Sequence, residues 1–168
     1  DWRAVHRGFL GAFRDLWVSE NSPLPMIEEA QQKGKRIFIT GHSLGGALAQ
    51  LCAASLCQRL IIPTVYTFGS PRVGNRRFVK ALNNFLSDEL FRHENNNDVV
   101  PRVPPVLFGY RHAGQRFHLT ANGKILKNPG WWIVLKDRLY GRWKDFGKPG
   151  SDGAKDHFVA NYLRALEN

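Results

Sequence analysis

The sequence feature that most constrains the fold is the corner RIFITGHSLGG, in which Gly41, Ser43 and Gly45 stand between a strand-like run and a long helix pattern rich in small residues. In a strand-to-helix elbow the central residue has strained backbone geometry, and side chains two positions before and after it collide with neighbouring elements. We therefore expect Gly41 and Gly45 to remove both collisions. Ser43 would then project its hydroxyl above the carboxyl end of a sheet, with the Leu44 N–H at the helix start as an oxyanion donor. The alternative interpretation is an ordinary glycine-rich capping turn.

Helix and strand patterns alternate along the rest of the chain. Apolar residues at helical spacing cover residues 4–17, 24–34, 44–59, 75–86 and 157–166. Strand patterns cover 36–40 and 63–69, and a further strand begins at 90 and runs into an asparagine-rich loop. Asn122-Gly123 lies between alternating apolar positions of 115–126, which predicts a hairpin. The order predicts an α/β fold, a mostly parallel sheet flanked by helices, in one domain over residues 1–168.

A serine hydroxyl becomes a good nucleophile when a base takes its proton and a third group orients that base. Among six histidines we favour His157, because it opens the last helix pattern after the flexible run GKPGSDGAKD. His112, in the loop GYRHAG, is a second candidate that could line the site. His42 adjoins the serine, but successive side chains diverge in an elbow, so we do not expect it to be the base. The remaining three are interpreted as packing, polar-face or cross-strand residues: His6, His93 and His118.

The orienting carboxylate is expected between serine and histidine in the chain. Asp98 fits this order, because it follows the strand pattern LFRHENNN and is fixed from behind by VVPRVPP. The alternative is a loop carboxylate that bonds to nearby backbone. Other carboxylates are expected away from the site: Asp88 and Glu89 at the opposite edge of the sheet, Asp137 and Asp145 on a solvated face, and Asp152 and Asp156 near the last helix, with Asp156 as a cap or first-turn acid.

The chain is strongly basic, with a formal net charge of +10. This excess favours anionic partners, but the basic residues are scattered and no nucleic-acid-binding motif accompanies them, so we expect no nucleic-acid partner. No run approaches the roughly 20 apolar residues of a membrane span, and no signal-peptide pattern is visible, so the sequence assigns no compartment.

The segment 131–148 combines aromatic and basic residues. Apolar side chains recur at spacings of three or four, at Trp132, Leu135, Leu139, Trp143 and Phe146. A basic amphipathic helix with tryptophans suits the surface of an anionic bilayer. The other interpretation is a helical insertion packed over the core with its basic residues facing water. Gly141 weakens any helix here.

Cysteine and metal chemistry are not predicted to contribute. Cys52 and Cys57 lie five residues apart on one helix pattern, which separates their Cα atoms by roughly 8 Å and exceeds the reach of a disulfide. We expect both to be reduced. The run SDGAKD lacks the spacing of a calcium loop, and we expect no cofactor.

Six blocks along the chain carry a family resemblance: VHRGFLGAF, ITGHSLGGALAQL, TFGSPRVGN, NNNDVVPRVPP, GYRHAG and DHFVANYL. Their order over residues 5–163 resembles the class 3 lipases, the fungal-type triacylglycerol lipases of the α/β-hydrolase superfamily. In that family the elbow serine, the aspartate of the ND-V-P block and the histidine of the terminal DH form a catalytic triad. The matching positions are Ser43, Asp98 and His157, the same three that chain order and placement favour.

The resemblance implies hydrolysis of lipid carboxylic esters through an acyl-enzyme. Phospholipid, galactolipid or soluble esters are alternative substrates, and a non-catalytic, lipase-like interaction protein is an alternative of another class. Family members begin with further strands, which provide a second oxyanion donor, followed by a helical lid. The chain starts at Asp1, just before VHRGF. We therefore expect residues 1–168 to be the C-terminal portion of an N-terminally truncated catalytic domain.

Overall fold

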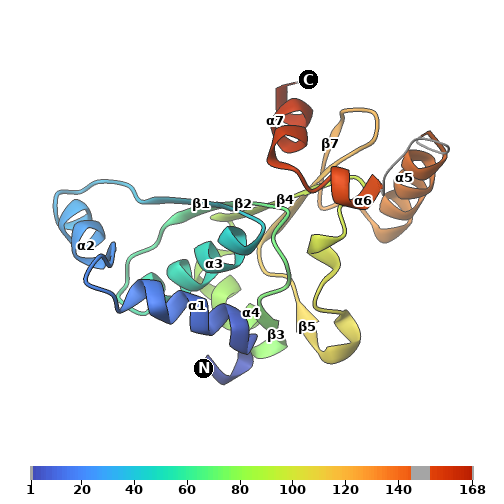
Figure 1. The fold of residues 1–168 in the computed structure, drawn as a ribbon. Helices are drawn as coiled ribbons and strands as arrows, with labels where there is room; N and C mark the ends of the chain where they lie inside the picture. The colour runs from blue at the N-terminus through green and yellow to red at the C-terminus, as the bar shows by residue number, and fades with distance from the viewer. Residues whose placement is uncertain (1, 145–151, 168) are drawn as a thin grey trace.

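The computed structural model of the protein describes residues 2–144 and 152–167, and within them the centre of the fold is a five-stranded sheet with the order β1-β2-β4-β6-β7 (Figure 1). The pairings β1–β2, β2–β4 and β4–β6 are parallel, and β7 is antiparallel to β6. The strands are β1 Phe38–His42, β2 Thr64–Phe68, β4 Leu90–Asn95, β6 Gln115–Leu119 and β7 Ile125–Lys127. The prediction of a mostly parallel α/β sheet is confirmed, as is the hairpin around Asn122-Gly123.

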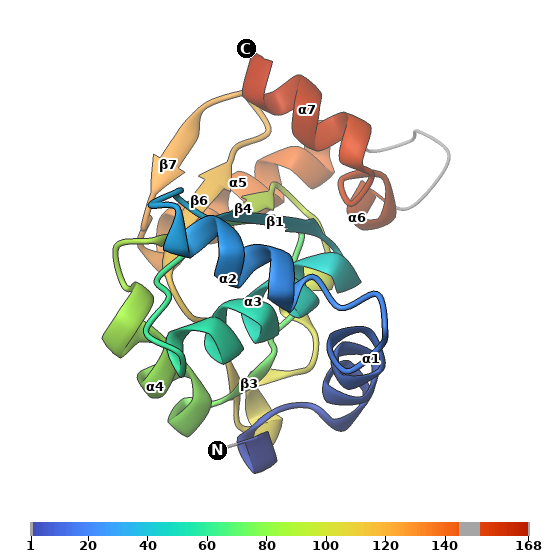
Figure 2. The same ribbon diagram turned by 90° about the vertical axis from the view of Figure 1, so that its left-hand side faces the viewer.

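Helices cover the two faces of the sheet unequally. One face carries α1 (Arg7–Trp17), α3 (Leu44–Cys57) and α4 (Arg76–Leu86), whereas α7 (Val159–Glu167) lies on the other (Figures 1 and 2). The helix α3 is buried along most of its length, because its small and apolar side chains pack between the sheet and α1. The main core cluster therefore lies on the α3 side and includes Ala47, Leu51 and Val65, all fully buried.

Shorter elements and one long helix complete the chain. The helix α2 (Leu24–Gln32) precedes β1, and the short strands β3 (Gly74–Asn75) and β5 (Tyr110–Arg111) form a separate antiparallel pair. Beyond the carboxyl ends of the main strands lie α5 (Trp131–Lys144), α6 (Asp152–Lys155) and the 3-10 helix η2 (Val100–Arg102) (Figure 1). The other two 3-10 helices are η1 (Trp2–Ala4) and η3 (Val106–Phe108). The edge of the sheet at which Ser43 lies is therefore bordered by segments from the second half of the chain.

Several element boundaries differ from the sequence-based expectations. The first strand begins two residues later than predicted, at Phe38, and includes the glycine and histidine of the elbow. Val5 lies before α1 and forms an isolated bridge with Gly74. The last helix begins at Val159, so His157 stands in the turn between α6 and α7 rather than in the helix.

Both cysteines are free thiols, as predicted. Burial raises the pKa of the Cys57 thiol to about 11, which fits its place in the core cluster. Across residues 2–144 and 152–167 no helix is both long and apolar enough to cross a bilayer, and no group of His, Cys, Asp and Glu side chains is arranged to hold a metal ion.

Candidate active site

The elbow at Ser43 has the strained geometry that the sequence predicts. β1 ends at His42, Ser43 has φ 56° and ψ −125°, and α3 begins at Leu44. A Cβ atom at Gly41 would lie 2.2 Å from the carbonyl oxygen of Gly45, a distance that no side chain tolerates. The close approach of the strand end to the first turn of α3 therefore requires glycine at position 41.

The second position in the elbow that requires glycine is 46, not the predicted position 45. A Cβ atom built on Gly45 meets nothing within 4 Å, so the predicted collision at that position is wrong. At Gly46 the added Cβ would lie 2.7 Å from the Cβ atom of Ser70. The reason is the direction of the helix: position 46 faces the loop after β2, whereas position 45 faces open space.

Three side chains that are far apart in sequence form one hydrogen-bonded row at the strand ends. The Nε2 atom of His157 lies 2.8 Å from the Ser43 Oγ atom. Its Nδ1 atom lies 3.0 Å and 3.1 Å from the two carboxylate oxygens of Asp98. In this arrangement a proton can pass from the serine to Nε2 while the carboxylate accepts the Nδ1–H and fixes the tautomer.

The carboxylate of Asp98 is buried and held by two further donors. Its side chain is about 1% exposed. The Val100 N–H donates to one oxygen at 2.9 Å, and the Tyr162 hydroxyl donates to the other at 2.6 Å. Burial of an ionised carboxylate is costly unless hydrogen bonds replace its water, and these donors do so.

Tyr162 is a site residue that the sequence reasoning missed. Its side chain is 1% exposed, and its hydroxyl also accepts the N–H of Asn95 at 3.0 Å. Desolvation by burial, together with the neighbouring Asp98 charge, raises the pKa of this phenol, so the hydroxyl remains a donor. A tyrosine five residues after His157 in an amphipathic helix is the signal that was available.

Gly69 lies between the second and third members of the row. Its φ is +59°, and a Cβ atom there would be 2.8 Å from Asp98 Oδ2 and 3.0 Å from His157 Nδ1. The sequence identified this glycine only as the end of a strand. In the structure this glycine also leaves room for the hydrogen bond between Asp98 and His157, because a side chain at position 69 would push these two groups apart.

His42 is the other histidine in contact with the row. Its Nε2 atom donates to the backbone carbonyl of His157 at 2.7 Å, and the two rings lie 4.6 Å apart. Its side chain thus diverges from Ser43, as expected, and ties the elbow to the turn that carries the imidazole.

The other predicted alternatives lie elsewhere. His112, the second candidate base, has Nε2 2.7 Å from the Pro101 carbonyl and 3.6 Å from Glu94, and therefore does not join the row. His6 stands at the N-cap position of α1 without a side-chain capping bond, and His93 stacks between Phe68 and Phe117.

Two carboxylates differ from their predicted surroundings. Asp137 is not on a solvated face: it bonds to His118 Nε2 at 2.8 Å and accepts the Ala121 N–H. His118 is thus paired with a residue of α5 rather than across the hairpin. Asp156 is not a helix cap but accepts the N–H of Asn97 at 2.9 Å, next to Asp98. Asp145 lies outside the described residues, as does the side chain of Asp152.

The aromatic and basic segment is a helix as far as Lys144, and positions 145–148, with Phe146, lie outside the described residues. The interpretation of a helical insertion packed over the core is correct only in part: α5 packs inward, but its apolar stripe does not take part in that packing. Trp132, Leu139 and Trp143 are 59%, 57% and 75% exposed, whereas Val134 and Gly141 face inward. The core-facing side of α5 is thus narrow, and aromatic side chains point to solvent.

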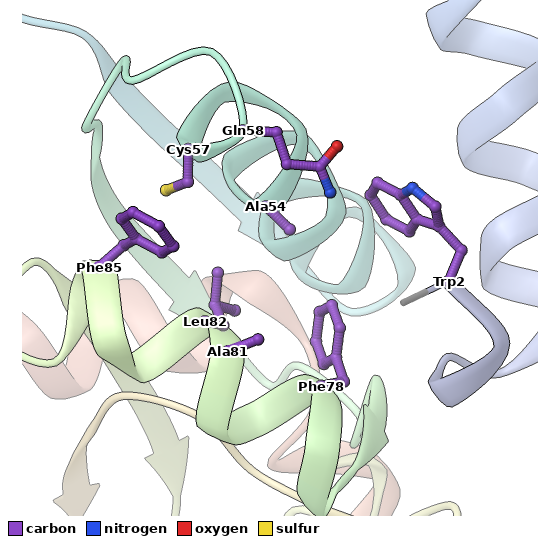
Figure 3. Close-up of a pocket in the computed structure, with 8 residues that line it drawn as sticks. All are labelled: Trp2, Ala54, Cys57, Gln58, Phe78, Ala81, Leu82 and Phe85. Atoms are coloured by element: carbon purple, nitrogen blue, oxygen red, sulfur yellow. The ribbon is translucent and has the colours of Figure 1, made fainter.

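A small apolar pocket lies apart from the serine row, between α3, α4 and the segment before α1 (Figure 3). Its volume is about 90 Å³, and its lining includes Trp2, Phe78 and Phe85. Ligand sites usually have several hundred Å³, so we assign no ligand to it.

The remaining component of the site is the start of α3. The N–H of Leu44 belongs to the first residue of that helix, where backbone donors have no intrahelical acceptor and the dipole favours negative charge. An oxyanion that forms on a carbonyl attacked by Ser43 would lie near this donor.

Comparison with known proteins supports a common ancestry. A family model described as Lipase (class 3) matches residues 2–108. The secreted mono- and diacylglycerol lipase 1 of Fusarium solani is 38% identical over 115 residues, which are 68% of this chain and 34% of that protein. The lipase of Rhizomucor miehei is 37% identical over 128 residues, 70% of this chain and 33% of that protein. The chain thus spans about a third of the length of these relatives.

Solved structures agree with the fold. The crystal structure of lipase from Rhizopus microsporus var. chinensis has a TM-score of 0.62 at 32% identity and covers 68% of this chain and 41% of its own. A second structure is described as a triacylglycerol lipase whose catalytic centre is a serine protease triad. It has a TM-score of 0.63 at 34% identity, and the match covers 73% of this chain and 48% of that one. With the family match over more than half of its length, the chain belongs to the class 3 lipase family.

Proposed function

We propose that the protein hydrolyses carboxylic esters of lipids of the acylglycerol type through an acyl-enzyme. The row from Ser43 through His157 to Asp98 carries this proposal. The names of the relatives from Fusarium and Rhizomucor support lipid esters as the substrate class.

In the proposed mechanism His157 Nε2 takes the proton of Ser43 as its oxygen attacks the ester carbonyl. The Leu44 N–H stabilises the oxyanion, and Asp98 stabilises the imidazolium. The imidazolium then protonates the leaving alcohol, which leaves the acyl group on the serine. A water molecule deprotonated by His157 releases the acid and restores the serine.

A fluorophosphonate probe tests the nucleophile directly. We expect covalent labelling of Ser43 in the wild-type chain and loss of labelling in Ser43→Ala and His157→Ala. Ser87→Ala, which changes an exposed serine at the end of α4, serves as the control and should label normally. Absence of labelling in wild type would instead support a non-catalytic interaction protein. A panel of glycerides, phospholipids and short-chain esters then ranks substrates.

We also infer that α5 contacts an anionic membrane surface. The aromatic side chains of α5 are exposed, Lys136 is exposed beside them, and the whole chain carries a net charge of +10. Indole rings at the headgroup level and cations near anionic lipids each favour such binding.

Vesicle co-sedimentation tests this contact. Binding to phosphatidylcholine vesicles should increase when phosphatidylserine is added and should fall in Trp132→Ala and Trp143→Ala. Phe85→Ala, an exposed aromatic residue on α4, is the control. Equal binding with and without phosphatidylserine would contradict the inference.

A further inference from the structure

A group of arginines surrounds one buried carboxylate beyond the catalytic row. Glu94 of β4 is 5% exposed and forms an ion pair with Arg92 of the same strand. Its other oxygen lies 2.5 Å from Arg116 of β6 and 3.9 Å from Arg138 of α5. We call Arg92, Arg116 and Arg138 the arginine cluster.

The arginine cluster has more positive charge than Glu94 can neutralise. Desolvation would raise the pKa of Glu94, but the surrounding cations lower it to about 2, so the carboxylate is ionised. Burial and the neighbouring Arg102 lower the pKa of Arg138 to about 10, which remains well above neutral pH. Three guanidinium groups therefore share one carboxylate charge.

Two donors of the arginine cluster have no acceptor in residues 2–144 and 152–167. These are the Nε–H groups of Arg92 and Arg116, both fully buried. The two residues are directly paired across β4 and β6, so their side chains leave the same face of the sheet. The side chain of Arg92 is only 7% exposed. Leaving a charged donor buried without an acceptor is unfavourable. A bound oxyanion at the exposed edge of the arginine cluster would offset this excess positive charge.

Solvent can reach the edge of the arginine cluster. The side chains of Arg116 and Arg138 are 21% and 25% exposed. Guanidinium groups bind phosphate oxygens through paired hydrogen bonds, so a phosphate group is the ligand that best fits several converging arginines.

We propose that the arginine cluster binds a phosphate group, either of a small soluble phosphate or of a phospholipid headgroup. The site is distinct from the ester-cleaving row but next to it, because Arg138 Nε donates to the Asn96 carbonyl and the Asn97 side chain donates to the Arg138 carbonyl. Both asparagines belong to the loop that leads into Asp98.

Thermal unfolding of the chain in sodium phosphate, with sodium chloride at equal ionic strength as reference, tests the site. Phosphate should raise the Tm of wild type in a saturable way, as expected for a ligand that binds only the folded state. Arg138→Gln, at the more exposed edge, should weaken the apparent phosphate affinity by about tenfold or more. Arg77→Gln, which removes an exposed arginine of α4, is the control and should respond as wild type does.

A second measurement distinguishes a small soluble phosphate from a phospholipid headgroup as the ligand. If phosphate displaces the chain from phosphatidylcholine vesicles that contain phosphatidic acid, and Arg138→Gln binds them less than Arg77→Gln does, the ligand is a headgroup. If vesicle binding is equal in the two variants while the phosphate response differs, the ligand is soluble. Equal Tm changes in phosphate and chloride, or an unchanged phosphate response in Arg138→Gln, would overturn the proposal. Ser43→Ala should lose ester hydrolysis and keep the phosphate response, so the two proposals fail independently.

Discussion

At the scale of single residues, the site depends on how one buried carboxylate is oriented. Asp98 accepts hydrogen bonds from the Val100 N–H, the Tyr162 hydroxyl and the His157 ring. Each of the first two donors comes from a different element, η2 or α7, so the carboxylate cannot rotate without breaking contacts to both. This fixes the direction in which the imidazole is held.

Replacement of Tyr162 by phenylalanine tests that constraint. The change leaves the buried Asn95 N–H without its acceptor and Asp98 with one donor fewer, so we expect the free energy of unfolding to fall by about 1–3 kcal/mol. The kcat of ester hydrolysis should fall by about tenfold, equivalent to about 1.4 kcal/mol, with little change in KM.

Tyr140→Phe is the matched control, because Tyr140 is an exposed residue of α5. A positioning function for Tyr162 also predicts a changed pH profile of kcat/KM. If Tyr162→Phe lost stability but kept both kcat and its pH profile, the tyrosine would be structural only.

Chain order was sufficient to select the three residues of the row, but not the groups that hold them. Ser43, Asp98 and His157 can be found because an elbow, a strand end and a late histidine each leave a local signal. Tyr162 leaves only its position five residues after His157, and Gly69 only the end of a strand pattern, because the importance of both arises from contacts across the fold. The same is true of His42, whose bond to the His157 carbonyl joins residues 115 positions apart.

At the scale of elements, substitutions at two adjacent glycines at the start of α3 are expected to change the stability of the fold in opposite directions. Gly45→Ala adds a methyl group in open space and improves helix propensity, so the free energy of unfolding should rise by up to about 1 kcal/mol. Gly46→Ala places the same methyl group 2.7 Å from the Ser70 Cβ atom. That overlap should lower the free energy of unfolding by about 1–3 kcal/mol.

Urea unfolding of the two variants beside wild type measures both changes. The comparison controls for composition, since each variant differs from wild type by one methyl group in the same helix turn. Equal effects of the two substitutions would contradict the packing of α3 against the loop after β2.

The spacing of apolar residues could not predict which face of α5 points inward. The spacing of its apolar residues predicted a helix, and α5 is one, but its inward face is set by the neighbours that it meets. Those neighbours are polar: Asn97 donates to the Arg138 carbonyl, and Asp137 bonds to His118. Because the partner surface is polar, the aromatic side of the helix faces solvent, a result that depends on tertiary context.

Gly141 permits the close approach of α5 to the asparagine loop. A Cβ atom there would lie 2.6 Å from the Asn96 side chain and 2.9 Å from that of Asn97. Gly141→Ala should therefore lower the Tm and slow ester hydrolysis, because the displaced loop carries Asp98. Gly11→Ala, in α1 with nothing within 4 Å of the added Cβ, should leave both unchanged or raise the Tm slightly. Normal hydrolysis in Gly141→Ala would indicate that α5 and the row are not coupled.

At the scale of the whole molecule, buried ionisable groups determine how the fold responds to acid. Desolvation lowers the pKa of His93, His112 and His118 from the ordinary value of 6.5, in His118 despite its bond to Asp137. The folded chain thus keeps these imidazoles neutral at pH values where the unfolded chain protonates them. Glu94 acts in the same direction at lower pH, because its folded pKa of about 2 is below its usual 4.5.

The sign follows from proton linkage. Below about pH 6.5 the unfolded state binds more protons than the folded state, so the free energy of unfolding decreases as the pH falls. Each imidazole contributes a slope of up to about 1.4 kcal/mol per pH unit, and Glu94 adds its own loss below its unfolded pKa of 4.5. Urea midpoints should therefore be higher at about pH 8 than at about pH 5. His118→Gln should have a smaller difference, because one proton-binding group is gone from the unfolded state. A stability maximum near pH 5 in the wild-type chain would mean that these imidazoles are not buried neutral in the folded state.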